Sequence, residues 1–181
     1  MPADLRDKIA DTWIELARRK SPEKITVRDL VDTCGIARQT FYYYFNDILA
    51  LTEYIMQRGR ALTRQACSKA ADAREAIRFY LDDTLLYASI GRKTHRSEPH
   101  FNELSLENIR TLVRDMLSFG LVQASCSQEE LDFVIDFFAA GMLRITDIEF
   151  ARPTPDTRGL SILLERTLRA LLAAFDTSRD R

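Results

Sequence analysis

The sequence has few of the residues that interrupt regular structure: it contains 6 glycines and 5 prolines in 181 residues. This scarcity argues against the many turns of an all-β fold and against long disordered stretches. The three cysteines, Cys34, Cys67 and Cys126, lie far apart and form no C-x-x-C pair of the kind found in zinc sites. We therefore expect reduced thiols in a protein of the cytoplasm, not a disulfide framework.

Long apolar runs are absent as well. No stretch approaches the ~18 consecutive apolar residues of a transmembrane helix. The charged beginning of the chain lacks the apolar core of a signal peptide. The hydrophobic content of 46% is still sufficient for a substantial core. The sequence thus predicts a cytoplasmic globular protein without a membrane partner.

An excess of either charge is also lacking. The chain carries 26 basic and 27 acidic residues, for a net charge of -1. Residues 1–50 likewise hold as many basic as acidic side chains. Proteins that bind nucleic acids usually show a basic surface. Any DNA contact must therefore depend on where individual charges lie.

Motifs for catalysis and for bound cofactors or metals are missing. There is no glycine-rich phosphate loop, no nucleophile elbow and no H-E-x-x-H pair. His95 and His100 stand five residues apart, a poor metal spacing without further ligands. The sequence therefore predicts no enzyme, no cofactor and no metal site.

What the chain does contain is helical periodicity along almost its whole length. No useful β alternation is present, so the predicted fold class is all-α. The periodicity and the breaks in it predict helices over about 3–19, 26–34, 37–44, 48–70, 73–90, 103–119, 128–150 and 157–176.

Residues 26–45 combine three features that together indicate a helix-turn-helix. Thr26 and Asp29 form an acidic variant of the capping box. Gly35 can adopt the left-handed conformation of a tight turn. The short helix that follows should bury Ile36, Phe41 and Phe45. The polar residues left on its other side are Arg38, Gln39, Thr40, Tyr42 and Tyr43.

These side chains suit contact with DNA. Arginine and glutamine read guanine and adenine edges, whereas threonine and tyrosine hydroxyls bind phosphates. The alternative is that Tyr42, Tyr43 and Tyr44 only pack and that the polar residues are simply solvated. The joint occurrence of cap, turn and polar face favours the DNA-binding interpretation.

The stretch ITVRDLVDTCGIARQTFYYYF, residues 25–45, resembles the head of the TetR family of transcriptional regulators, and the whole resemblance covers ~45 contiguous residues. The segment CGIARQTFYYYFNDI further resembles the branch related to dihydroxyacetone kinase regulators. The resemblance implies that Arg38 and Gln39 read bases and that Arg28 reaches the groove edge. It also implies that Thr26 caps its helix beside a phosphate. Phosphate or mixed contacts are implied for Thr40, Tyr42 and Tyr43.

The sequence departs from the family pattern in three places. Tyr44 stands where histidine is commonest, and Ala37 occupies a position often held by a capping serine or asparagine. That second change removes a cap of about 1 kcal/mol. Asn46-Asp47-Ile48 replaces a segment in which many members carry lysine, so one or two phosphate contacts are missing.

The domain organisation expected from these patterns is a helix-turn-helix DNA-binding domain at residues 1–46 and a helical ligand-sensing and dimerisation domain at residues 47–181. The last two predicted helices are apolar on much of their circumference. One stripe on the earlier helix contains Phe133, Phe137 and Ala140. The resemblance implies a homodimer through these two helices, and the interface residues expected from the denser stripes are Leu131, Ile135, Phe138, Met142, Leu160, Leu164, Leu168 and Leu171. An internal helix of a monomer is the alternative.

Residues that contact an effector are less well marked, because methionines and aromatic residues at helical spacing also form ordinary cores. The candidates for an effector pocket are Met56, Phe79, Tyr80, Tyr87, Phe101, Met116 and Phe119.

The resulting hypothesis is a homodimeric repressor that binds a palindromic operator in double-stranded DNA. A small-molecule effector, unknown from the sequence, would release it. The alternative is a ligand-responsive co-regulator that acts through a protein partner without binding DNA by itself. The balanced charge and the missing lysines motivate this alternative.

Overall fold

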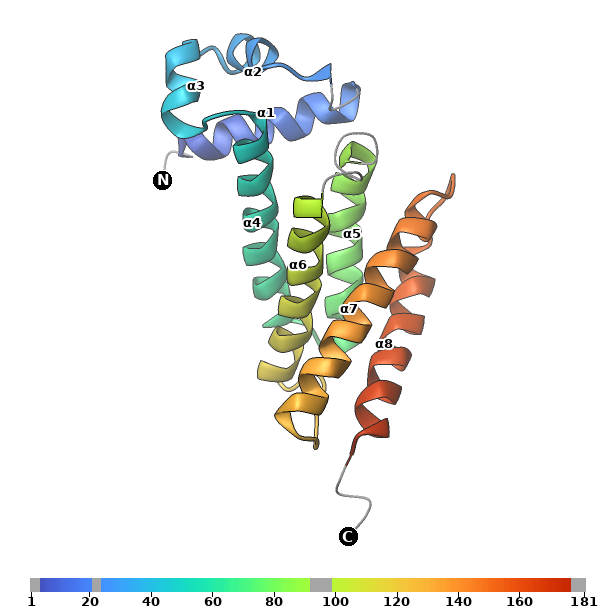
Figure 1. The fold of residues 1–181 in the computed structure, drawn as a ribbon. Helices are drawn as coiled ribbons and strands as arrows, with labels where there is room; N and C mark the ends of the chain where they lie inside the picture. Colours follow the sequence, from blue (N-terminus) through green and yellow to red (C-terminus); the bar gives the residue numbers. More distant parts are fainter. Residues whose placement is uncertain (1–3, 21–23, 92–98, 177–181) are drawn as a thin grey trace. The chain divides into compact units, whose positions relative to one another are not determined.

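The computed structural model describes residues 4–20, 24–91 and 99–176, and these ranges fold into helices without any strand (Figure 1). The predicted all-α fold is confirmed. The helices are α1 (Leu5–Arg19), α2 (Val27–Cys34), α3 (Arg38–Tyr44), α4 (Ile48–Cys67), α5 (Ala73–Gly91), α6 (Pro99–Ser118), α7 (Gln128–Phe150) and α8 (Thr157–Ala174).

The chain divides into two compact units. The first comprises Met1–Gly59 and Leu86–Pro99, and the second comprises Arg60–Leu85 and His100–Arg181. We call the described residues up to 59 the head and the described residues of the second unit the body. The domain boundary expected after residue 46 stays a prediction. The core of the head nevertheless includes Leu51 and Ile55, which follow that boundary.

The head is held together by apolar side chains from α1, α2, α3 and the first half of α4. Ile9 and Trp13 of α1, Leu30 of α2 and Phe41 of α3 are buried in one cluster with the α4 residues. Asp4 caps α1 by accepting a hydrogen bond from the Arg6 amide at 3.2 Å. Ile9 and Trp13 of α1 therefore point into this core.

The turn between α2 and α3 has the geometry that the sequence predicts. Gly35 adopts a φ of 68° and ends α2 in the left-handed conformation. Its amide and that of Ile36 both donate to the Val31 carbonyl, the latter at 3.1 Å. A residue with a β-carbon would be strained at this φ, which explains why glycine stands here.

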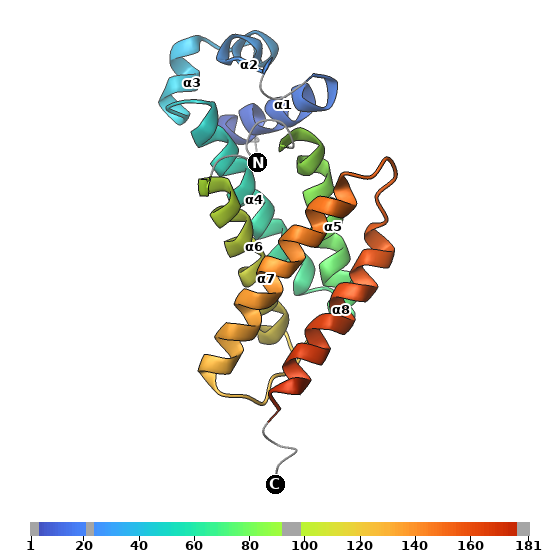
Figure 2. The ribbon, with the colours of Figure 1, turned by 45° about the vertical axis from the view of Figure 1, so that its right-hand side comes forward.

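In the body, α7 and α8 run side by side in opposite directions (Figures 1 and 2). Ser127 and Glu130 form a capping box at the start of α7, and Asp156 caps α8. The turn between the two helices is fixed by Glu149, whose carboxylate accepts from the Asp156 amide at 2.9 Å. The side chain of Arg110 on α6 binds Asp136 on α7 at 2.7 Å.

The core of the body draws on each of its helices. Tyr80 and Leu81 come from α5, and burial raises the pKa of Tyr80 to about 12. Cys67 at the end of α4 is also buried. Other buried residues are Ile109, Leu112, Val113 and Met116 of α6, Val134, Ile135, Phe138 and Met142 of α7, and Leu160, Leu164, Leu168 and Leu172 of α8.

No described helix combines the length and the apolar character needed to cross a membrane. Within the described ranges, histidine, cysteine and carboxylate side chains also form no group of three that could hold a metal ion. His95 and the side chain of His100 lie outside the described part of the chain.

Candidate nucleic-acid interface

The third helix separates its apolar and polar residues cleanly. Phe41 is fully buried, and Phe45, directly after the helix, is 3% exposed. On the opposite side Tyr42 is 44% and Tyr43 is 82% exposed. Arg38 and Gln39 are exposed as well, and Thr40 is half-buried. The side of α3 opposite Phe41 therefore presents Arg38, Gln39, Tyr42 and Tyr43 to solvent.

The base-reading candidate Arg38 is positioned by its own helix. Its Nη2 donates to the Tyr42 hydroxyl at 3.3 Å, and its guanidinium lies 5.7 Å from the centre of the Tyr42 ring. Residues four apart on a helix are neighbours, so this contact follows from the spacing. Tyr42 is therefore tied to Arg38, whereas Tyr43 packs edge-on against Tyr44 with ring centres 5.0 Å apart.

The amino end of α3 has no side-chain cap, as the sequence predicts. Ala37 occupies the N-cap position in an extended conformation, and no side chain there accepts a hydrogen bond. The start of α3 is therefore stabilised by backbone hydrogen bonds alone, in which the Thr40 and Phe41 amides donate to the Ala37 carbonyl at 2.9 and 3.3 Å.

Thr26 caps α2 as predicted, but its hydroxyl is fully used in doing so. It accepts from the Asp29 amide at 3.2 Å and donates to Asp29 Oδ2 at 2.7 Å. Lys20 Nζ binds the same carboxylate oxygen at 2.7 Å. The hydrogen bond from Lys20, followed by the one from the Thr26 amide, holds the pKa of Asp29 well below its usual range. An ionised carboxylate therefore occupies the start of α2, where the resemblance suggested a phosphate.

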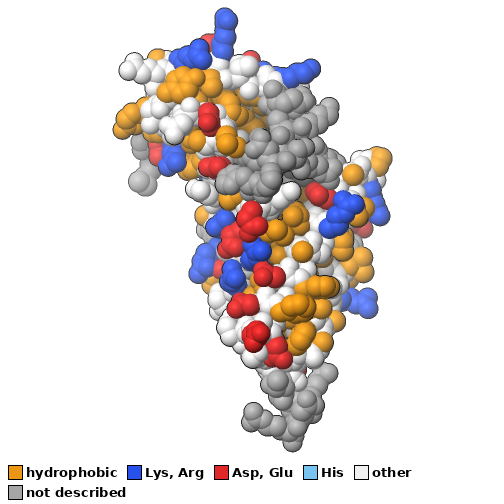
Figure 3. Space-filling view, viewed as in Figure 1, with side chains coloured by type: hydrophobic (Ala, Val, Ile, Leu, Met, Phe, Trp, Pro, Cys, Tyr) orange, Lys and Arg blue, Asp and Glu red, His pale blue; other side chains and the backbone are white. Residues whose placement is uncertain are grey.

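Arg28, the residue expected to reach the groove edge, is also paired with an acid. Arg28 Nε lies 3.6 Å from the Asp32 carboxylate, although 89% of the Arg28 side chain is exposed. Exposed pairs of this kind are weak, so Arg28 can still exchange Asp32 for a phosphate. Figure 3 shows that basic side chains lie along the edge of the head formed by α2 and α3.

The unusual Asn46-Asp47-Ile48 segment has a structural role. Asp47 Oδ1 accepts from the Ala50 amide at 2.8 Å and so caps α4. Asp47 lies in the segment where the family pattern often has lysine, and it stabilises the start of α4. This helix supplies Leu51 and Ile55 to the head core.

A polar cluster that the sequence analysis missed joins α1 to α4 within the head. The Tyr54 hydroxyl donates to Asp7 at 2.7 Å, and Arg58 binds both Asp7 at 3.3 Å and Asp11 at 2.5 Å. The Arg6 guanidinium stacks 4.1 Å above the Tyr54 ring. The regular spacing of Tyr54 and Arg58, and of Asp7 and Asp11, was the signal: each pair is four residues apart on one helix face.

The residues proposed for an effector pocket come from both units, and their contact with an effector stays a prediction. Met56 is a half-buried residue of the head, Tyr80 and Met116 are buried in the body core, and Phe79 and Phe119 are each 39% exposed. None of them lines the cavity at the loop between α6 and α7. The side chains of Tyr87 and Phe101 lie outside the described part of the chain.

The interface predicted for a dimer requires a correction. Ile135, Phe138, Met142, Leu160, Leu164 and Leu168 are each at most 7% exposed because they pack in the core of their own chain. Leu131 and Leu171 are half-buried. Side chains already enclosed by their own protomer cannot meet a second one. The prediction placed the denser apolar stripes of α7 and α8 at the dimer interface, but these stripes pack in the body core.

The second stripe of α7, together with the outer side of α8, remains uncovered. Figure 3 shows hydrophobic side chains gathered along α7 beside a row of acidic ones. The large apolar residues exposed on these two helices are Phe133 (58%), Phe137 (58%), Ile145 (46%), Ile148 (49%), Ile162 (36%) and Leu163 (60%).

Comparisons with known proteins agree with this architecture. Residues 9–55 match the family model described as bacterial regulatory proteins, tetR family. The solved structure of the dihydroxyacetone kinase operon activator DhaS is similar, with a TM-score of 0.75 and 20% identity over 95% of this chain and 98% of that one. A tetR-family transcriptional regulator from Streptomyces coelicolor gives a TM-score of 0.67 and 17% identity, over 93% of this chain and 83% of that one.

A search of curated protein sequences gave no match. At these identities the structural likenesses establish a shared fold for the body, while the match of residues 9–55 concerns the head itself. The head therefore resembles the tetR family of bacterial regulatory proteins over residues 9–55, a range that includes α2 and α3, and the fold is shared with the two solved structures.

Proposed function

We propose that the protein binds double-stranded DNA by inserting α3 into the major groove. The observation that carries this proposal is the division of α3 into a buried side, with Phe41, and an exposed side with Arg38, Gln39 and Tyr43. Arg38 and Gln39 read base edges. Thr40, Tyr42 and Tyr43 contact phosphates, and Tyr42 in addition positions Arg38.

The functional unit of the proposal is a homodimer formed through the exposed face of α7 and α8. This face contains Phe133, Phe137 and Leu163, which are each more than half exposed. Ala140 and Gly141 follow Phe137 on α7 and are exposed, and the open space beside Gly141 suits the close approach of a second copy. A two-fold dimer presents two copies of α3 to the two halves of a palindromic operator.

The proposed regulation is release of the operator on binding of a small-molecule effector, which gives a repressor. An effector that prefers the conformation with low DNA affinity shifts the population by its differential affinity. The similar DhaS structure is named as an operon activator, and this supports an activator as the second candidate. Both candidates use the same DNA contacts.

The alternative without DNA binding remains a distinct hypothesis: a co-regulator that responds to a ligand and acts through a protein partner. Its support is the pairing of Lys20 with Asp29 and of Arg28 with Asp32, which leaves few free cations in the described part of the head. Neutralised phosphates are the main source of affinity for DNA. A direct binding measurement separates the two hypotheses.

The test is fluorescence anisotropy with DNA from upstream of the protein's own gene, at about 50 and 200 mM salt. We expect sequence-specific binding that weakens at the higher salt. Arg38→Ala should cost about 1–3 kcal/mol on the preferred sequence and relax the preference at one base pair. Tyr43→Phe should weaken preferred and random sequences alike. We choose Tyr43 for this comparison because Tyr42 touches Arg38.

The matched control is Arg78→Ala, which removes the same charge from an exposed position on α5 in the body. It should leave both affinity and base preference unchanged. Binding that shows no sequence preference and no salt dependence would sink the DNA-binding proposal in favour of the co-regulator. Equal losses of preference in the Arg38 and Tyr43 variants would contradict the division of roles.

A further inference from the structure

The body contains a cavity of about 320 Å³ between the loop that joins α6 to α7 and the carboxyl-terminal end of α8. Its lining includes Leu121, Val122 and Gln123 from the loop, and Arg169, Leu172 and Ala173 from α8. The volume lies at the lower end of the range of small-molecule sites. No residue that we assign to DNA contact or to dimerisation takes part in it.

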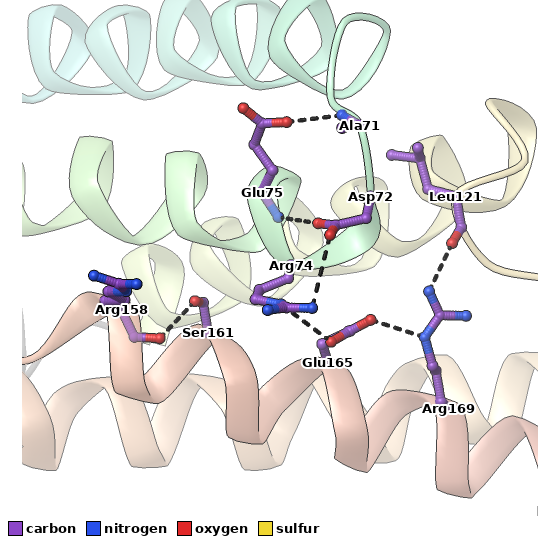
Figure 4. Close-up of polar contacts among 9 residues, drawn as sticks. All are labelled: Ala71, Asp72, Arg74, Glu75, Leu121, Arg158, Ser161, Glu165 and Arg169. Atoms are coloured by element: carbon purple, nitrogen blue, oxygen red, sulfur yellow. Dashed lines mark hydrogen bonds and ion pairs between the residues drawn. The ribbon is translucent and has the colours of Figure 1, made fainter.

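Arg169 is held in place at this cavity by a chain of polar contacts (Figure 4). Its Nε donates to Glu165 at 2.9 Å, and its Nη2 donates to the Leu121 carbonyl at 3.2 Å. Glu165 is only 12% exposed and also pairs with Arg74 of α5 at 3.5 Å. Arg74 in turn lies 3.8 Å from the Asp72 carboxylate.

These contacts preorganise the Arg169 side chain. Because Nε and Nη2 are both engaged, the plane of the guanidinium is fixed between α8 and the loop. Nη1 has no hydrogen-bond partner within the part of the chain that the structure describes, and 48% of the side chain is exposed. A fixed cationic donor beside Val122, Leu172 and Ala173 is the pairing of groups that binds an anionic head with an apolar body.

We propose that this cavity binds a small organic carboxylate whose carboxyl group accepts a hydrogen bond from Arg169 while its apolar part contacts Leu172 and Val122. A carboxylate suits the site better than a phosphate because Asp176 also lines the cavity and would repel a dianion. The planar guanidinium favours a planar oxyanion. The proposal does not depend on DNA binding, and its test involves no DNA.

The probe is benzoate, with benzamide as the neutral molecule of the same shape. Each is titrated into the full-length ¹⁵N-labelled protein and followed by amide chemical shifts. We expect benzoate to bind saturably with a Kd of about 1 mM or tighter. The largest shifts should be at Gly120, Leu121 and Gln123. Benzamide should bind at least tenfold more weakly, because it lacks the charge that Arg169 recognises.

Two variants locate the site. Arg169→Gln removes the charge, and Ala173→Phe fills the cavity while leaving Arg169 and Glu165 in place. Both should weaken benzoate binding at least tenfold. Arg158→Gln removes a charge from an exposed position on the same helix and should leave the affinity unchanged. If Arg169→Gln destabilises the fold, Ala173→Phe and the comparison of benzoate with benzamide still decide the question.

The proposal is overturned if benzoate shows no saturable binding up to about 10 mM. It is also overturned if benzamide binds as tightly as benzoate, or if the cavity-filling variant keeps the wild-type affinity. Shifts confined to residues outside the loop and α8 would likewise contradict it.

Discussion

At the scale of single residues, the head uses its acidic side chains to build the fold. Asp29 completes the capping box of α2 and forms an ion pair with Lys20. Asp7 and Asp11 of α1 form ion pairs with Arg58 of α4. Several acidic side chains of residues 1–50 therefore form internal pairs that stabilise the head. The exposed residues of α3 include no acid, so the surface proposed for DNA carries a net positive charge.

The contact between Tyr54 and Asp7 predicts a particular pH dependence of stability. The Tyr54 hydrogen bond is the largest cause that holds the pKa of Asp7 below its ordinary value of 3.8, and Arg58 acts in the same direction against desolvation. A carboxyl whose pKa is lower in the folded state adds stability above its ordinary pKa. This contribution is lost as the pH falls through the lowered value.

Tyr54→Phe should therefore lower the urea midpoint of unfolding at pH 7, and the difference from wild type should shrink at about pH 3. The control is Tyr44→Phe, which removes a half-buried phenolic hydroxyl in the same unit without touching Asp7. It should show no such trend. A difference between Tyr54→Phe and wild type that is independent of pH would show that Asp7 does not depend on this hydroxyl.

At the scale of elements, helix bounds were the part of the structure best predicted from the sequence. Apolar spacing, the breaks in it and the Thr26 cap placed the starts of α2, α4, α7 and α8 within about one residue, because these signals are local. The start of α6 was expected near 103 but falls at Pro99. Proline suits the first turn of a helix, and interpreting it only as a break caused this error.

The sequence could not decide which apolar side of α7 faces its own core. Both stripes have the same chemistry, and only the packing of α5, α6 and α8 distinguishes Phe138 from Phe137. The same limit applies to the effector candidates, since Tyr80 and Met116 satisfy the periodicity of a core equally well. Long-range pairs such as Arg58 with Asp7 also depend on a helix contact that no local pattern specifies.

The uncapped start of α3 predicts that a cap can be added there. Ala37 is exposed and already has the extended conformation of an N-cap residue. Ala37→Ser should raise the free energy of unfolding by about 1 kcal/mol, because the hydroxyl can accept from an unpaired amide of the first turn. The control is Ala61→Ser, at an exposed position inside α4. An unchanged midpoint in urea for Ala37→Ser would contradict the missing cap.

Neighbouring leucines on α8 distinguish the dimer face from the core. Leu163 is 60% exposed and Leu164 is 3% exposed. Leu163→Glu should yield a folded monomer, since it places a charge in the interface. Leu164→Glu should unfold or aggregate the chain, because it buries an unpaired charge. Light scattering and circular dichroism measure the two outcomes, and a Leu163→Glu protein that stays dimeric would place the interface elsewhere.

At the scale of the whole molecule, the proposed dimer forms through the α7–α8 face of the body, and its two-fold symmetry supplies two copies of α3 for one operator. One copy of α3 supplies few base contacts, and the paired basic residues keep its phosphate affinity modest. Useful affinity for an operator therefore requires that two heads bind the same DNA. Linking two sites raises the overall affinity without any new contact.

The most direct measurement compares an intact operator with a single half-site, for the wild type and for Leu163→Glu. The operator is first defined by footprinting DNA upstream of the protein's gene. The wild type should bind the intact operator at least about 10² times more tightly than the half-site, because the second head binds DNA to which the first already holds it. Leu163→Glu should bind both DNAs with the affinity of the half-site. A Leu163→Glu monomer that keeps the wild-type affinity for the intact operator, or a wild type that does not distinguish the two DNAs, would contradict the account.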